Sequence, residues 1–183
     1  MTNIEFQQLD ANAYDFPDAT IDAVVCRWGL MFLSDLAGAL GRMRRSLKPG
    51  RVLAAVTWGE AEKVPIISIR RRVMRAFDLP KSPNDPFRLS SPVTLEKTAV
   101  AAGFEDVEVA RAIVPYEYAS VDAFVEMQRE AHESRLTALL ARTPAQQAEF
   151  WHALGAAAEP YAGSDGVVRV PSEILLTAAR ARA

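Results

Sequence analysis

The chain carries LDANAYDFPDATIDAVVCRWGLMF at Leu9–Phe32 and MRRSLKPGRVL at Met43–Leu53, and these two stretches decide its fold. Ile21–Cys26 is almost continuously apolar, which is typical of a parallel strand that is covered on both faces. Ser34 can cap a helix whose apolar residues fall on one stripe, and that helix ends before a second buried strand at Val52–Thr57. A strand, a helix and a strand in this order predict a parallel crossover unit.

The flanking residues extend this α/β pattern. The strand Val107–Tyr118 contains Pro115, which favours an edge position or a bulge because proline has no N–H for the ladder. Ser120 can cap a helix of about 20 residues. The other expected elements are strands at Asn3–Leu9 and Val167–Ala179 and helices at Pro65–Asp78, Ser91–Gly103 and Thr143–Glu159.

Composition excludes several classes of protein. Half of the 183 residues are hydrophobic, which is enough to bury a core, and the net charge of −2 argues against a general nucleic-acid partner. With one cysteine and two histidines, neither an internal disulfide nor a structural zinc site is expected. No apolar run is long enough for a membrane span, so we expect a cytoplasmic protein.

Both opening stretches resemble the second half of a class I S-adenosylmethionine-dependent methyltransferase. The subgroup is similar to the type 11 methyltransferases, which include ubiquinone/menaquinone-biosynthesis C-methyltransferases. Three later stretches continue the resemblance, namely Asp85–Leu89, Ala102–Val109 and Val170–Arg180. The family's Pro-Gly-Gly helix end appears here with Arg51 as its last residue, while Gly50 still supplies the unusual backbone angles.

The resemblance implies an N-terminally truncated, Rossmann-like α/β sheet with an inserted helical lid and antiparallel C-terminal strands. The family orders its strands third, second, first, fourth, fifth, seventh, sixth, and this chain would begin at the third. Its nine glycines include no G-x-G, so the glycine-rich cofactor turn of the family is missing. Ile21–Cys26 then becomes an edge strand, which leaves three outcomes open: pairing with Asn3–Leu9, pairing of two chains, or insolubility.

We expect a single domain over residues 1–183. Residues 1–60 would be the remaining Rossmann-like half, and 61–119 would add helices and a strand. Residues 120–160 would form the helical lid over the carboxyl ends of the strands, and 161–183 the closing strands.

Four residues are implied to bind S-adenosylmethionine. Asp10 and Ala11 would lie beside the adenine, whereas the alternative for Asp10 is an aspartate that caps a turn. Cys26 and Arg27 follow a strand at its carboxyl end, where open α/β sheets bind ligands, and would face the methionine part. Cys26 can instead be a small core residue with an inert thiol. Arg27 can pair with the cofactor carboxylate, an acidic substrate or a surface carboxylate.

Trp28 and Met31 are the predicted substrate-binding residues. They can wall an apolar acceptor pocket, whereas core packing is favoured for Phe32. His132, in the expected lid, can serve as a general base, although a lone helical histidine is more often a surface or core residue. No catalytic residue and no metal ligand is assigned, since transfer from a sulfonium needs mainly alignment.

The leading hypothesis is a methyltransferase, or a fragment of one, that transfers a methyl group to a small molecule. Aromatic residues such as Trp28, Trp58, Phe87 and Phe124 favour an apolar or aromatic acceptor. The alternative is a non-catalytic methyltransferase remnant that acts as an oligomerising or interaction protein, with a homo-oligomer as one outcome. The isolated chain is expected to bind the cofactor weakly and to be inactive, because the glycine turn is missing.

Overall fold

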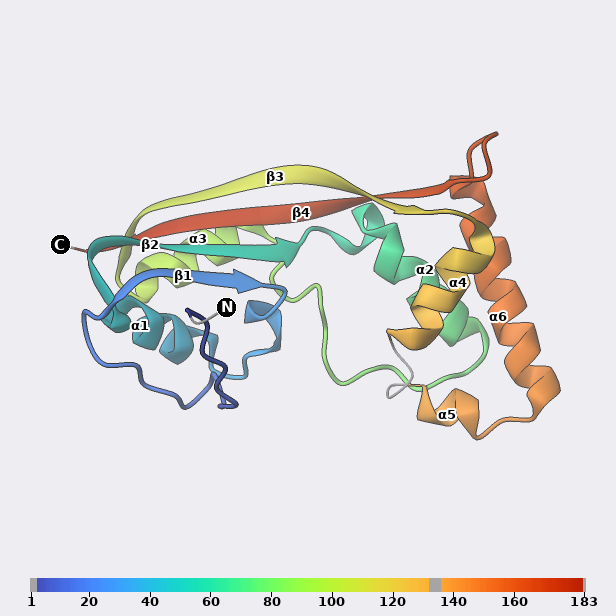
Figure 1. Cartoon of the computed structure of the whole chain (residues 1–183), viewed down its shortest axis with the longest axis horizontal. Helices are drawn as coiled ribbons and strands as arrows, with labels where there is room; N and C mark the ends of the chain where they lie inside the picture. The colour runs from blue at the N-terminus through green and yellow to red at the C-terminus, as the bar shows by residue number, and fades with distance from the viewer. Residues whose placement is uncertain (1–2, 132–135, 183) are drawn as a thin grey trace. The chain divides into compact units, whose positions relative to one another are not determined.

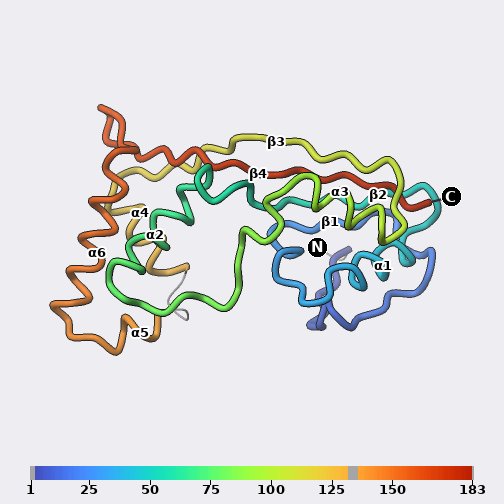
Figure 2. Tube along the Cα trace, turned by 180° about the vertical axis from the view of Figure 1, so that it is seen from behind, coloured from blue at the N-terminus to red at the C-terminus, as the bar shows by residue number. Residues whose placement is uncertain are grey.

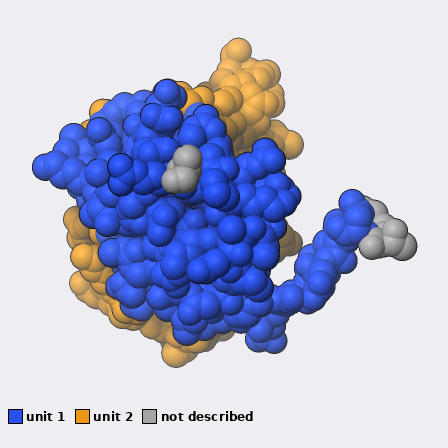
Figure 3. All heavy atoms as spheres, turned by 90° about the vertical axis from the view of Figure 1, so that its left-hand side faces the viewer, with its two compact units in different colours: residues 1–58, 86–111, 175–183 blue, residues 59–85, 112–174 orange. Residues whose placement is uncertain are grey.

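The computed structural model describes residues 3–131 and 136–182, and it divides the chain into two compact units (Figure 3). Unit 1 comprises Met1–Trp58, Pro86–Arg111 and Leu175–Ala183, and unit 2 comprises Gly59–Asp85 and Ala112–Ile174. The boundary falls within two long strands, so each unit contains part of both. The four-part division of a single domain stays a prediction.

Four strands form one sheet in the order β1-β2-β4-β3 (Figure 1). They are β1 (Ile21–Arg27), β2 (Leu47–Trp58), β3 (Phe104–Tyr118) and β4 (Val168–Ala181). β1 and β2 are parallel, as predicted, while β4 returns to the C-terminus against β3 (Figure 1). This order is the fourth, fifth, seventh and sixth strand of the expected arrangement. It confirms that β1 and the proline-containing β3 lie at edges.

Helices α1 (Leu36–Ser46) and α3 (Pro92–Ala101), labelled in Figure 2, belong to unit 1. The short 3-10 helix η1 (Leu30–Phe32) belongs to the same unit. Ser91 caps α3 as predicted, whereas α1 is capped by Asp35, whose side chain accepts from the Gly38 N–H, and not by Ser34. Gly103 has φ +89°, which only glycine adopts readily, and it turns the chain from α3 into β3. The core of unit 1 includes Leu40, Leu53, Leu95, Phe104 and Leu175.

Two predicted elements are wrong. Asn3–Leu9 is not a strand: it is exposed throughout, with Phe6 at 92 %, and the Gln7 side chain hydrogen-bonds to those of Glu5 and Tyr14. An extended segment becomes a strand only with a partner, and β1 does not supply one here. The long helix expected from Ser120 is α4 (Val121–Glu130), which has 10 residues, followed after a gap in the described residues by α5 (Thr137–Leu140).

Unit 2 is mainly helical. It contains η2 (Ala61–Lys63), α2 (Pro65–Ala76), α4, α5, α6 (Pro144–Ala158) and η4 (Glu159–Tyr161). The predicted capping box of α6 is confirmed, since Thr143 and Gln146 bond reciprocally. α2 and α4 pack against α6 around Ile69, Phe124 and Phe150. The lid role of residues 120–160 stays a prediction.

Candidate functional site

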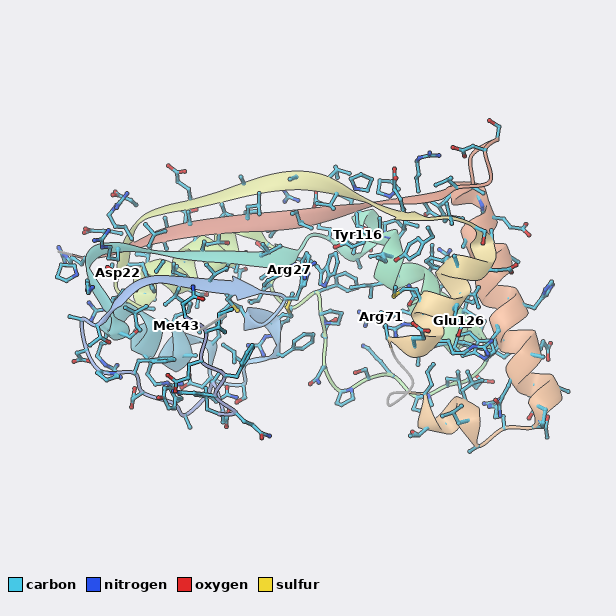
Figure 4. The ribbon with its side chains drawn as sticks, viewed as in Figure 1. Asp22, Arg27, Met43, Arg71, Tyr116 and Glu126 are labelled. Carbon is cyan, nitrogen blue, oxygen red and sulfur yellow. The ribbon has the colours of Figure 1, made fainter. Side chains whose placement is uncertain are left out.

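The carboxyl ends of β1 and β2 lie side by side. Their parallel register pairs Cys26 with Ala55 and Arg27 with Val56, and the Trp28 N–H donates to the Val56 carbonyl at 3.1 Å. Arg27 is seen at the tip of β1 in Figure 4. Because ligands bind at the carboxyl ends of strands in open α/β sheets, this end of unit 1 is the candidate site.

Two indole rings are stacked at this end. Trp28 and Trp58 follow and close their strands, and their ring centroids are 3.8 Å apart at an interplanar angle of 10°. Trp28 has φ +59°, a left-handed conformation that is unusual for a bulky residue. Such strain is concentrated at functional sites, so the backbone supports the candidate assignment. The sequence indicated aromatic residues here, but it did not predict their stacking.

Arg27 is exposed beside this stack. Its guanidinium carbon lies 5.7 Å from the Trp28 ring centroid, within the range of a cation–π interaction. Among the residues that the structure describes, no carboxylate lies within ion-pair distance of Arg27. The structure therefore does not show the surface salt bridge that was one of its three expected roles.

Cys26 is partly buried against the core of unit 1. A Cβ added at Gly29 would lie 2.7 Å from its Sγ, so the turn after β1 passes close to the thiol.

In η1 the expected exposures differ from those observed: Met31 is 1 % exposed within the core, while Phe32 is 40 % exposed. The predicted core packing of Phe32 is wrong, and the substrate-binding role of Met31 stays a prediction.

Asp10 organises a tight turn on the surface of unit 1. Its Oδ1 accepts hydrogen bonds from the Asn12 backbone N–H at 2.8 Å and side-chain amide at 3.0 Å. Its carbonyl accepts from the N–H groups of Ala13 and Tyr14. The bonds from the Asn12 backbone and then side chain, with the charge of Arg42, lower the pKa of Asp10. The carboxylate is therefore ionised at neutral pH and is an acceptor.

Asn12 anchors the turn to the start of α1. Its Oδ1 accepts from the Ser34 N–H at 2.9 Å, the Ser34 hydroxyl at 3.0 Å and the Asp35 N–H at 3.3 Å, and Arg42 donates to its carbonyl. The segment before Ser34 leads back through η1 to Trp28, so Asn12 joins the turn to the chain that follows β1. Sequence reasoning missed this role of Asn12.

Other kinds of site find no support in the part of the chain that the structure describes. Within residues 3–131 and 136–182, no three histidine, cysteine, aspartate or glutamate side chains are grouped so that they could hold a metal ion. No helix in these ranges is long and apolar enough to cross a membrane. His132, the candidate base, lies outside the described residues.

Comparison with known families and curated proteins identifies relatives of the N-terminal part. Residues 1–55 match the family described as "Methyltransferase domain". The ubiquinone/menaquinone biosynthesis C-methyltransferase UbiE of Marinomonas sp. (strain MWYL1) is 38 % identical over 60 residues, which are 33 % of this chain and 24 % of that protein. The UbiE of Hahella chejuensis (strain KCTC 2396) is 39 % identical over 66 residues, 36 % and 26 % of the two chains. The match thus spans about a quarter of these relatives.

Solved structures show the same fold over nearly the whole chain. The YcgJ protein of Bacillus subtilis is 17 % identical with a TM-score of 0.56, and the match covers 99 % of this chain and 72 % of that one. Phosphoethanolamine N-methyltransferase 2 of Haemonchus contortus, in complex with phosphomonomethylethanolamine and S-adenosylhomocysteine, is 20 % identical with a TM-score of 0.50, covering 95 % and 36 %. At these identities the likeness shows a shared Rossmann-like fold.

Proposed function

Because the chain belongs to the class I S-adenosylmethionine-dependent methyltransferases, we propose that it binds this cofactor and serves methyl transfer to a small molecule. The observation that carries the proposal is the Asp10–Asn12 turn, which Asn12 anchors to the segment following the carboxyl end of β1. The chain between this segment and β1 runs through η1, which supports the assignment of Cys26 and Arg27 to the same site as Asp10 and Ala11.

The residues present fit one side of the cofactor. The Asp10 carboxylate is exposed and ionised, and only its Oδ1 is used within the turn, so Oδ2 can accept the exocyclic amine of adenine. The neighbouring Ala11 is exposed, and its backbone N–H can bond a ring nitrogen. The 183 residues contain no G-x-G turn for the remaining contacts, so the chain alone should bind weakly.

Bound S-adenosylmethionine supplies a methyl group on an activated sulfonium. The chain's own residues would orient the two reactants, which is the main requirement of such a transfer. Cys26 and Arg27 would face the methionine side, and Trp28 would wall the acceptor beside them. The stack on Trp58 and the hydrogen bond to Val56 hold the Trp28 ring in one place.

Isothermal titration with S-adenosylhomocysteine tests the proposal. We expect a Kd of about 1 mM or weaker for the chain, and a further loss of about tenfold in Asp10→Asn, since a charge-assisted hydrogen bond contributes about 1.5–3 kcal/mol. Asp22→Asn is the matched control, because Asp22 is also an exposed aspartate of unit 1 but lies at the opposite end of β1 from Arg27 (Figure 4). Equal losses of affinity in both variants would show that Asp10 does not contact the ligand. A micromolar Kd for the unmodified chain would contradict the expected weak binding.

A second candidate is the non-catalytic remnant that acts by association. It is favoured by the edge position of β1, where Val25 is 77 % exposed and the strand contains no proline or lysine that would block pairing. Size-exclusion chromatography with light scattering over a range of concentrations would then show a dimer. A monomer that persists at all concentrations rejects this candidate. An in-frame D-x-G-x-G-x-G in the DNA upstream of the Met1 codon would favour the enzyme instead.

A further inference from the structure

We propose that Arg27 and Trp28 hold the methyl acceptor, and that this acceptor is an aromatic carboxylic acid. The guanidinium of Arg27 would bind the carboxylate, and the Trp28 indole would contact the flat ring. The inference rests on the proposed function. It moves Arg27 from the methionine side of the cofactor to the acceptor, and it adds the chemical class of the substrate.

Arg27 offers a cation with no anion beside it. Elsewhere in unit 1, Arg42, Arg45 and Arg51 each lie within 4 Å of an aspartate carboxylate. Arg27 has no such partner among the described residues, although it lies at the carboxyl end of a parallel strand. A guanidinium presents a planar fork of N–H donors that matches a carboxylate, so an anion is the ligand it would select.

Trp28 offers a fixed apolar surface next to that cation. Its left-handed backbone is held by the hydrogen bond from its N–H to Val56, and its ring is held by the stack on Trp58. The guanidinium lies 5.7 Å from the same ring, so one ligand of a single ring's size can reach both groups. Offset stacking on an indole favours an aromatic ring over a saturated one, so we expect the ligand to contain an aromatic ring.

A carboxylate near Arg27 can come from two sources, the acceptor or the methionine part of the cofactor. The acceptor is favoured because the cation lies over the aromatic residue, and a methionine chain has no ring to place there. The two sources are separated by the pair S-adenosylhomocysteine and 5′-methylthioadenosine, since the second lacks the amino-acid carboxylate.

The test titrates the 183-residue chain with 4-hydroxybenzoate and follows tryptophan fluorescence, without cofactor. We expect quenching that saturates, at least about tenfold weaker binding of the neutral 4-hydroxybenzamide, and weaker binding of cyclohexanecarboxylate. Arg27→Gln should abolish the preference for the acid over the amide, and Arg27→Lys should retain part of it. Arg45→Gln is the matched control, because Arg45 is a half-exposed arginine of α1 that pairs with Asp15, and it should leave the preference unchanged.

Three results would overturn the inference. The first is equal binding of acid and amide, and the second is an unchanged preference in Arg27→Gln. The third is that Arg27→Gln still binds the aromatic acid but no longer prefers S-adenosylhomocysteine to 5′-methylthioadenosine. That result assigns the guanidinium to the cofactor carboxylate. Because the aromatic acid is titrated alone, failure of the acceptor assignment stays distinguishable from failure of cofactor binding.

Discussion

Replacing Trp28 by glycine should leave the protein more stable than replacing it by alanine. Both variants remove the stack on Trp58, which is a partly buried aromatic pair, and both should therefore lose about 2 kcal/mol of unfolding free energy. They differ in the backbone, because φ +59° costs a residue with a Cβ about 1–2 kcal/mol, and glycine adopts this angle readily. After allowance for the greater freedom of glycine in the unfolded chain, Trp28→Gly should be about 1 kcal/mol more stable than Trp28→Ala.

Urea unfolding of the two variants measures this difference, with the fluorescence of the remaining tryptophans as the signal. Arg27 supplies the control at the preceding position, since it lies in an ordinary strand conformation. There the order should reverse, with Arg27→Gly about 0.5–1 kcal/mol less stable than Arg27→Ala. A Trp28→Gly variant that is no more stable than Trp28→Ala would refute the argument that strain is held at this residue.

Three further perturbations follow from local contacts. A Cβ at Gly59 would lie 2.7 Å from Cγ of Glu173, which is 5 % exposed, so Gly59→Ala should lose about 1–3 kcal/mol in urea unfolding. Adding Glu173→Ala should recover part of this loss, and strictly additive losses would count against the clash. Asn12→Ala removes the acceptor of three hydrogen bonds, so the two backbone amides bonded to it should exchange faster with deuterium. Unchanged exchange would contradict the anchoring role. The hydrogen bond and charge of Lys48 lower the pKa of Asp22 below 3.8. This pair therefore stabilises the fold above pH 3.8 and loses its effect as the pH falls through the lowered pKa. Titration by NMR should show the pKa rising in Lys48→Met, and an unshifted pKa would argue against the pair.

Local signals predicted much of the fold. Ser91 caps α3, and a capping box at Thr143 begins α6. Both caps involve a residue only three positions further along the chain, and both form as the sequence indicates. The order of the last four strands followed from the resemblance, and Pro115 indicated the edge position of β3. Asn3–Leu9 was misread because alternation alone does not make a strand, which also needs a neighbour to bond.

The arrangement of the candidate site was harder to predict because it depends on distant pairs. Asn12 and Ser34 are 22 residues apart, and no sequence pattern joins them. Trp28 and Trp58 come from different strands, and only the parallel register brings their rings together. Core packing was predicted for Phe32, but a 3-10 helix has three residues per turn and directs neighbouring side chains to different sides.

We propose that the Asp10–Asn12 turn and the end of β1 together bind one side of S-adenosylmethionine. An amide NMR map of the isotope-labelled chain, titrated with S-adenosylhomocysteine to millimolar concentration, tests it most directly. We expect fast-exchange shifts that saturate together at Ala11, Asn12, Arg27 and Trp28, with a Kd of about 1 mM or weaker. The absence of shifts at these amides, or their confinement to unit 2, would contradict it.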